Sequence, residues 1–284
     1  MIRLLLTSAA LMTFIPAAMA ANAAVPVTQT ALAAAPLAPK TTPIPPGVKL
    51  VEPHLHVTPA GKPATRVALT FDACMGKTDM RILDALIAQN VPATIFVTAR
   101  WLRGNPQALA LMLAHADLFE LENHGLNHIP TVDFPTLVYG IAAAGSPAAV
   151  AAEVQGGSEA MLAHGIPRAH WFRGATAKYD LSAIAEIRAM GFDVAGYSIN
   201  GDAGASLPAA AVEKQYLSAR DGDVLISHIN QPTHAAGEGV VKGIAGLKAR
   251  GVQFVRLQDF AERGDDNTTG PPSRQAAAGA PLKP

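Results

Sequence analysis

Few features of the sequence could hold the chain together outside a packed core. Cys74 is the only cysteine among the 284 residues, so no disulfide can form within the chain. Aromatic residues make up 5% of the sequence and include two tryptophans, which argues against a surface platform of stacked rings. Charge of one sign is also lacking, because 22 basic side chains balance 22 acidic ones. Nucleic acid and anionic membrane surfaces are therefore not expected as partners.

The first 20 residues have the pattern of a secretory signal. An early Arg3 precedes a short apolar run that Pro16 interrupts, and small residues stand at positions 18 and 20. This pattern predicts cleavage near residue 20 and export, which makes the mature protein periplasmic or secreted. A retained anchor is the alternative, but the run is short and broken for a membrane span. No stable membrane insertion is expected after cleavage.

Two further segments lack the large apolar residues that a folded core requires. Residues 21–65 are rich in alanine, proline and threonine, and residues 264–284 have the same character. Such segments bury too little surface to offset the entropy of ordering them. They are predicted to be a disordered linker and a disordered tail. The remaining residues, 66–263, have the length of one domain with a full core.

Within that domain, short apolar runs alternate with segments of helical spacing. The predicted strands cover residues 67–71, 93–98, 119–121, 170–172, 194–199, 224–227 and 252–257. Helices are predicted around residues 82–87 and 106–112, and over 147–164, 181–190, 208–219 and 238–250. Strand runs with little polar alternation are typical of a parallel sheet covered by helices. The pattern allows an irregular barrel or an open doubly wound sheet.

Polar side chains gather where the predicted strands end. They are Asp72, His124, His128, Arg173, Asn200, Asp202 and His228. In parallel α/β folds the carboxyl ends of the strands form the face on which active sites lie. Residues with only structural roles would not show this bias. The sequence therefore predicts a catalytic site on that face.

Two of these histidines have the spacing of metal ligands. His124 and His128 are four residues apart, so their imidazoles can bind one ion if the segment is helical or tightly turned. The alternative is a solvated loop with incidental histidines, because short motifs are often matched by chance.

Asp72 and His228 have the chemistry of a base and an opposed acid. Burial at a strand end raises the pKa of a carboxylate, and a cation such as Arg173 or a metal lowers it again, which suits a general base. His228 would then give a proton to a leaving amine. Alternatively, Asp72 caps the following turn, and His228 packs over the end of its strand.

Cys74 is a nucleophile by residue type, but its setting favours packing. No histidine is adjacent to it in the sequence, and small buried cysteines are common. A reactive thiol needs a partner that lowers its pKa. We therefore predict a packing role for this residue.

Five segments resemble, in order, the five motifs of the polysaccharide deacetylase family, the NodB-like enzymes of carbohydrate esterase family 4. The segments are TFDAC at 70–74, ENHGLNH at 122–128, WFRGAT at 171–176, YSINGDA at 197–203 and LISH at 225–228. The resemblance spans nearly the whole domain. An ordered set of five motifs is far more specific than any one of them.

The resemblance implies a fold, a reaction and a set of roles. The fold would be a distorted (β/α)7-type barrel of the α/β class, and the reaction would remove acetyl groups from N-acetylated sugars in a glycan. The implied catalytic residues are Asp72 as the base, Arg173 as the residue that orients it, and His228 as the acid. His124 and His128 would hold a divalent metal, with zinc favoured. Around the acetyl group the resemblance places the backbone N–H near Thr176, the apolar wall of Ile226, and Asn200 at the start of the fourth motif.

This chain departs from the family pattern at a metal ligand. Ala73 stands where the family usually has a second, metal-binding aspartate. Two neutral imidazoles supply no charge to offset the ion, so a metal that is kept needs water or a substituting acid as a further ligand. Asp79, Glu122 and Asp202 are candidates. Asp79 is favoured because it lies on the same segment as Asp72.

The leading expectation is thus an exported metal-dependent deacetylase of an N-acetylated glycan. Two alternatives stay open. The domain could be a metal-independent amidohydrolase that acts on a small C–N substrate. It could also be a glycan-binding domain without catalysis, although the scarcity of aromatic residues disfavours it.

Overall fold

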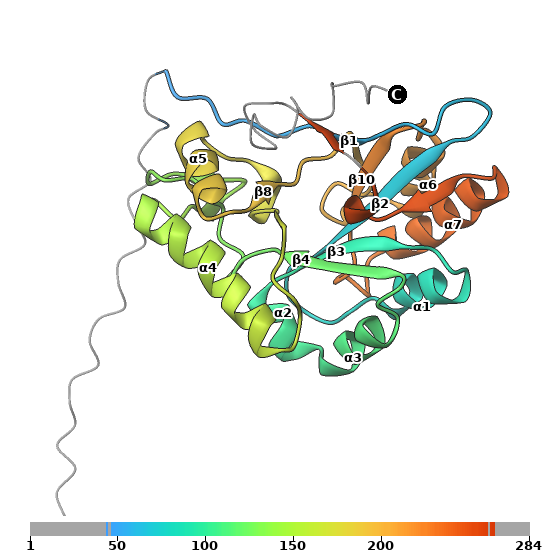
Figure 1. Ribbon diagram of the computed structural model, residues 1–284, viewed down its shortest axis with the longest axis horizontal. Helices are drawn as coiled ribbons and strands as arrows, with labels where there is room; N and C mark the ends of the chain where they lie inside the picture. Colours follow the sequence, from blue (N-terminus) through green and yellow to red (C-terminus); the bar gives the residue numbers. More distant parts are fainter. Residues whose placement is uncertain (1–43, 45–46, 261, 265–284) are drawn as a thin grey trace, which may run out of the picture. The chain divides into compact units, whose positions relative to one another are not determined.

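The fold is built on one large, mainly parallel sheet, shown in Figure 1. The computed structural model describes residues 44, 47–260 and 262–264. Six parallel strands form the centre of the sheet, in the order β10-β2-β3-β4-β7-β8. Their bounds are β10 (Asp223–His228), β2 (Arg66–Ala73), β3 (Ala93–Val97), β4 (Phe119–Asn123), β7 (Trp171–Phe172) and β8 (Asp193–Val194). Nearly every residue of β2 and β3 is buried, which is why these strands read as continuous apolar runs.

The sheet curls into a distorted barrel. β9 (Ile199–Asn200) pairs with β10, and β11 (Gln253–Val255) pairs with β2, both in parallel. Between β8 and β9 the chain crosses towards β10 without a regular strand. There the backbone N–H of Tyr197 donates to Pro53, and that of Ser198 donates to Val224. The predicted (β/α) barrel is therefore confirmed, and irregular backbone fills its closure.

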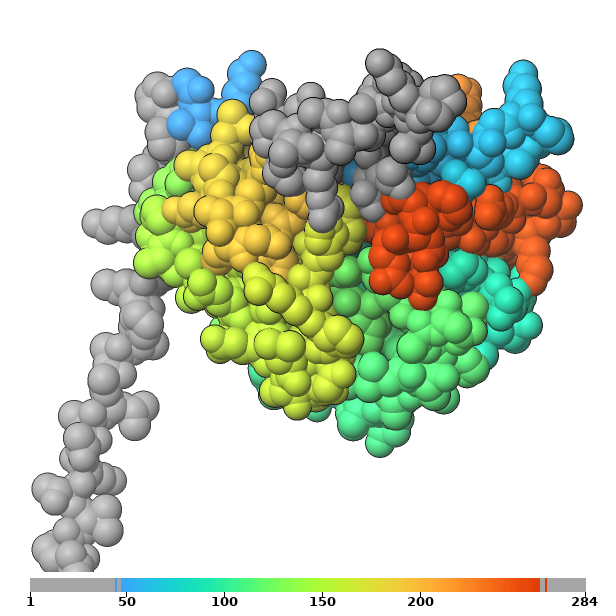
Figure 2. Space-filling view, viewed as in Figure 1, coloured from blue at the N-terminus to red at the C-terminus, as the bar shows by residue number. Residues whose placement is uncertain are grey.

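Helices cover the outside of the sheet. They are α1 (Met80–Ala88), α2 (Ala99–Gly104), α3 (Pro106–Ala114), α4 (Pro147–Ala163), α5 (Leu181–Ala189), α6 (Ala209–Leu217) and α7 (Ala236–Ala249). In Figure 1, α1 to α3 lie below the strands, α4 and α5 to the left, and α6 and α7 to the right. From the same side, the side chains of α3, α4 and the segment around β11 hide most of the strands (Figure 2). No helix of the described residues is long and apolar enough to span a membrane.

The two faces of the strands have different surroundings. Leu69, Phe71 and Ala73 of β2 belong to the core cluster that includes helix residues such as Ile82. Ala68, on the opposite face of β2, belongs to a second cluster inside the barrel. Side chains alternate between the faces of a strand, so Asp72 points to the interior side and Ala73 points to the helices.

The predicted elements agree well with the structure, with a few differences. Each predicted strand run contains a strand, and the run at 194–199 is divided into β8 and β9. Each predicted helix is present, whereas α2 was not predicted. A small hairpin of β5 (Leu137–Val138) and β6 (Ile141–Ala142) was also missed, because strands of two residues carry no periodic signal.

The predicted linker over residues 21–65 is wrong for residues 47–65. These residues include β1 (Leu55–Val57), which pairs antiparallel with β10 and with β12 (Glu262–Gly264). Leu55 and Val57 are fully buried. Asp221 accepts N–H bonds from Ala60 and Arg66, at 2.8 Å each. The predicted signal, the rest of the linker and the tail from residue 265 lie outside the described residues.

Candidate active site

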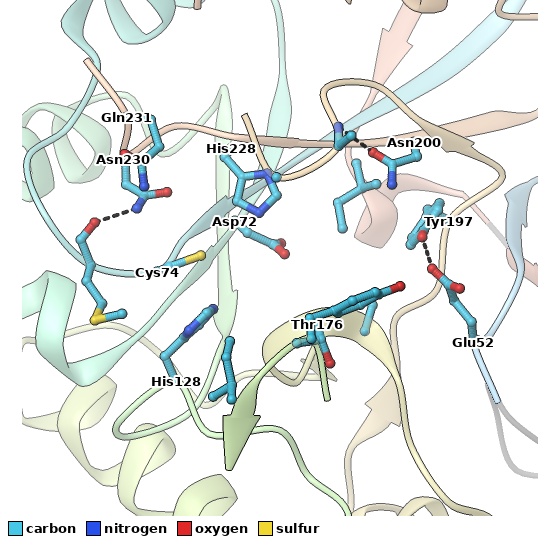
Figure 3. Close-up of a pocket in the computed structure, with 17 residues that line it drawn as sticks. Glu52, Asp72, Cys74, His128, Thr176, Tyr197, Asn200, His228, Asn230 and Gln231 are labelled. Atoms are coloured by element: carbon cyan, nitrogen blue, oxygen red, sulfur yellow. Dashed lines mark hydrogen bonds between the residues drawn. The ribbon is translucent and has the colours of Figure 1, made fainter. Parts of the chain in front are cut away.

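A cavity of about 530 Å³ opens at the carboxyl ends of the parallel strands. Residues that the sequence analysis singled out line this cavity, and Figure 3 shows six of them: Asp72, Cys74, His128, Thr176, Asn200 and His228. Ile226 adds an apolar wall. Asp72 and His228 stand at paired positions of the neighbouring strands β2 and β10. His124 and Arg173 are buried behind the cavity, 1% and 0% exposed.

Arg173 holds Asp72 in place. Its Nη1 donates to Asp72 Oδ1 at 2.9 Å and to Thr70 Oγ1 at 2.9 Å. Its other nitrogens donate to the carbonyls of Ala195 and Gly196, so the guanidinium has little freedom to turn. Burial raises the pKa of Asp72, but the charges of His124 and Arg173 outweigh it and lower the pKa below its usual value. The carboxylate is therefore ionised at neutral pH and can accept a proton.

Asp202 favours the protonated form of His228, whereas Arg173 favours the deprotonated form of Asp72. The fully buried Asp202 carboxylate lies 3.0 Å from His228 Nδ1 and accepts the backbone N–H of His228 at 2.6 Å. Burial would lower the pKa of His228, but the charge and hydrogen bond of Asp202 raise it well above its usual value. His228 is therefore protonated at neutral pH and can give a proton. Asp202 serves this histidine and does not join the metal cluster, contrary to its candidacy as a ligand.

His124, His128 and Cys74 form a cluster of metal-binding type. Their ligand atoms all lie within 4.8 Å of one another. His124 Nδ1 lies 2.5 Å from the carbonyl of Arg173 and donates to it, which directs Nε2 towards the cluster. Cys74 Sγ lies 3.4 Å from that Nε2. Burial raises the pKa of the Cys74 thiol, but the charge of His124 and hydrogen bonds from the histidines lower it well below its usual value.

A tight turn, not a helix, presents the two imidazoles. Gly125 and His128 have φ values of +92° and +62°, and the ring centroids of the two histidines are 5.0 Å apart. The buried carboxylate of Glu153 in α4 accepts backbone N–H bonds from Asn127 and Ile129. A Cβ on Gly125 would lie 2.4 Å from Glu153 Oε1, so glycine is needed where this carboxylate approaches. Glu153 was missed in the sequence because it lies 25 residues beyond the turn, within a helix.

The structure contradicts the prediction that Asp79 completes the metal site. Asp79 caps α1, where it accepts the N–H of Arg81 and pairs with the Arg81 guanidinium at 2.6 Å. It does not line the cavity. A carboxylate that starts a helix satisfies free N–H groups there and is neutralised by its arginine. Glu122 is also occupied, because it accepts the backbone N–H groups of His170 and Trp171.

Thr176 and Asn200 border the cavity, Thr176 in a turn of unusual geometry and Asn200 at the end of β9. Thr176 and Ala177 have φ values of +71° and +52° in the short 3₁₀ turn Ala175–Ala177. Residues in this region are strained and occur often at functional sites. The Thr176 hydroxyl is buried and has no hydrogen-bond partner among the described residues. Asn200 accepts the N–H of Ala203 at 2.8 Å, so it shapes the adjacent loop.

The mouth of the cavity has an aromatic and charged rim that the sequence did not reveal. Tyr139, at the tip of the β5–β6 hairpin, is 72% exposed, and its ring centroid lies 4.9 Å from Lys178 Nζ. The Tyr197 hydroxyl donates to Glu52, which also pairs with Lys178 at 3.8 Å. These residues are far apart in the sequence, and isolated tyrosines give no signal of their shared position.

The family of the domain follows from a match of its sequence to a known family. Residues 60–195 match the family described as polysaccharide deacetylase. We therefore assign residues 60–195 to this family. The match ends at β8, and Asp72, His124, His128 and Arg173 lie within it. Among curated proteins, none matches the chain.

Solved structures of carbohydrate esterase family 4 share the fold of this deacetylase domain. A peptidoglycan N-acetylglucosamine deacetylase aligns with a TM-score of 0.59 and 18% identity, over 72% of this chain and 90% of that chain. A family 4 acetyl xylan esterase from Clostridium thermocellum, solved with a cobalt ion, aligns at 0.55 and 22%, over 69% and 89%. A family 4 pseudoenzyme from Bacillus anthracis aligns at 0.55 and 19%, over 72% and 69%.

Proposed function

We propose that the chain is an exported, metal-dependent deacetylase that hydrolyses the acetamide of N-acetylated sugars in a polysaccharide. The observation that carries the proposal is the convergence of two opposite proton-transfer groups on one cavity. Asp72 is kept ionised and His228 is kept protonated, from paired positions on adjacent strands. Hydrolysis of an amide needs a base for the attacking water and an acid for the leaving amine.

Each proton has a route through named atoms. Arg173 occupies Asp72 Oδ1, which leaves Oδ2 to accept a proton from the attacking water. His228 gives a proton to the nitrogen of the departing amine. Its Nδ1 is bonded to Asp202, so Nε2 is the atom that faces the substrate. Before this transfer, Asp202 balances the charge of the imidazolium, and it keeps the ring oriented throughout.

The cluster around His124 and His128 fits a divalent metal of the zinc type. His124 Nδ1 donates a hydrogen bond to a backbone carbonyl. Metal-binding imidazoles usually make such a bond with the ring nitrogen that does not hold the ion. When bound, such an ion polarises the acetamide carbonyl and lowers the pKa of a bound water. The part of the two histidines is to hold and orient the ion beside Asp72.

The cavity also suits an acetylated sugar. Ile226 supplies an apolar wall for the acetyl methyl, and the backbone N–H near Thr176 is available to a developing oxyanion. Exposed Tyr139 at the rim offers one ring on which a neighbouring sugar of the chain can stack. Export rests on the secretory pattern of residues 1–20.

The proposal is tested by acetate release from chitin oligomers, peptidoglycan fragments and poly-N-acetylglucosamine. The metal-loaded parent protein is expected to release acetate from at least one of them, and Asp72→Asn and His228→Gln proteins are expected to release none above background. No release from any substrate by the metal-loaded parent would refute a deacetylase. Full activity after exhaustive chelation would instead favour the metal-independent amidohydrolase.

A non-catalytic glycan-binding domain is the second candidate. Two observations favour it, namely Ala73 at a usual ligand position and a similar fold in a family 4 pseudoenzyme. It predicts that a double Asp72→Asn, His228→Ala protein binds glycan as the parent does, while the parent shows no turnover. Acetate release that disappears in this double variant would exclude it.

A further inference from the structure

The end of β2 places Cys74, and not Ala73, on the metal side of the strand. Ala73 is fully buried in the cluster that packs against the helices. Asp72 and Cys74 both line the cavity, as the alternation of side chains requires. Figure 3 shows the Cys74 sulfur pointing into the cavity between His228 and His128. Beside the base Asp72, the side chain that this strand end presents to the two histidines is therefore that of Cys74.

The spacing of the donor atoms matches a metal site. In a tetrahedral zinc site, bonds of about 2.3 Å to sulfur and about 2.0–2.1 Å to nitrogen separate the two donors by roughly 3.5 Å. Cys74 Sγ lies 3.4 Å from His124 Nε2, and the His128 donor lies within 4.8 Å of both. Since Nδ1 of His124 donates to a carbonyl, Nε2 is the nitrogen that faces the sulfur. Two such donors require a proton or a cation between them.

A thiolate at Cys74 would also replace the negative charge that is absent because Ala73 stands in place of an aspartate. Two neutral imidazoles carry no charge, so a thiolate restores the single negative charge that an aspartate would supply. The nearby carboxylates have other roles: Asp72 pairs with Arg173 and serves as the base, Asp202 pairs with His228, and Asp79 pairs with Arg81. Among the described residues, Cys74 is the donor that groups with both histidines.

We propose that Cys74, as its thiolate, is the third protein ligand of a metal held by His124 and His128. The proposal rests on the metal dependence of the proposed function. A sulfur ligand makes the site selective for zinc and similar borderline ions over magnesium, calcium and manganese, which prefer oxygen. Zinc should therefore displace magnesium or manganese from the site even when these are present in large excess.

The test uses metal binding and needs no turnover. Because Cys74 is the only cysteine, a thiol reagent reports this residue alone in the metal-free full-length chain. Zinc is expected to block the reaction, and cobalt is expected to produce a sulfur-to-cobalt charge-transfer band in the near ultraviolet. In Cys74→Ser, the band should disappear and zinc affinity should fall by more than about 100-fold, beyond the loss of an outer hydrogen-bond partner.

Two further variants sharpen the result. Cys74→Asp should keep most of the zinc affinity but lack the cobalt band, because a carboxylate replaces the thiolate. Asp79→Asn is the matched control, since asparagine also caps helices, and it should keep the affinity and the band of the parent. A loss of affinity in Asp79→Asn with an unchanged Cys74→Ser would overturn the proposal.

A parent protein whose thiol stays reactive in excess zinc, and whose cobalt form lacks the band, also overturns it. These two measurements need no variant, so they decide even if Cys74→Ser fails to fold by circular dichroism. The outcomes remain separable from those of the proposed function. Acetate release with a freely reactive thiol refutes only the Cys74 ligand, whereas a thiolate band without acetate release refutes only the deacetylase.

Discussion

Removal of the Arg173 guanidinium should leave the buried Asp72 carboxylate without its hydrogen-bonded counter-ion. Arg173 is fully buried and donates hydrogen bonds to Asp72, to Thr70 and to two backbone carbonyls. Breaking a buried ion pair by deleting one partner typically costs about 3–5 kcal/mol, because a charge is left buried without compensation. We expect Arg173→Met to lower the free energy of unfolding by that amount near neutral pH.

The contribution of Asp72 to the pH dependence should shrink as well. In the parent, the lowered pKa of Asp72 contributes stability above its unfolded pKa, and this is lost as the pH falls through the folded value. Arg173→Met removes one of the charges and a hydrogen bond that offset burial, so the folded pKa of Asp72 rises and the stability that this group contributes above its unfolded pKa becomes smaller. The deficit of Arg173→Met should therefore be larger at about pH 8 than at about pH 5.

The assay is urea unfolding of the metal-free proteins, followed by circular dichroism. The double variant Arg173→Met, Asp72→Asn buries neither charge, so its loss should be smaller than the sum of the single losses by about 0.5–3 kcal/mol. Arg103→Met, at an exposed arginine, is the control and should change stability by less than about 0.5 kcal/mol. A loss below about 1 kcal/mol in Arg173→Met, or strict additivity in the double variant, would refute the reasoning.

Three further predictions follow from the site and the barrel interior. Asp202→Asn removes the charge that raises the pKa of His228, so the alkaline limb of kcat/KM for acetate release should move to lower pH; an unmoved limb would show that Asp202 does not set this pKa. Tyr139→Ala should raise KM for oligomers by up to roughly 10-fold, the range of one aromatic contact, with kcat kept, and an equal rise for a single sugar would argue against stacking. Burial and the charge of Glu120 raise the pKa of Glu122 well above its usual value, so its stabilisation holds at low pH and is lost as the pH rises through the folded pKa. The gain in unfolding free energy of Glu122→Gln should therefore grow with pH in urea titrations, and a constant difference would contradict the shared burial of the two carboxyls.

Much of the fold could be predicted from local patterns. Strands buried on both faces appear as apolar runs, and β2, β3 and β10 are of this kind. The predicted base and acid, Asp72 and His228, fall at the ends of such strands, and both line the cavity. Alternation along β2 already carried the signal for Cys74, because positions 72 and 74 share a face.

The remaining assignments depend on contacts between distant segments. Asp202 is an acid near a predicted site, and only the folded chain gives it to His228. Asp79 differs, because its cap of α1 and its pair with Arg81 are local contacts. Residues 47–65 appeared too polar to order, yet β1 gains its stability by pairing with β10 and β12.

The sequence by itself determined the strand and helix order, the face on which the chemistry lies and the opposed pair Asp72 and His228. These depend on the period of side chains along one strand or helix, which is a local property. Tertiary structure alone decided which group partners each of them, and it replaced Asp79 by Cys74 beside His124. Hydrogen bonds and charges act over a few ångströms in space, and residues that meet at that range here are 26 to 101 positions apart in the chain.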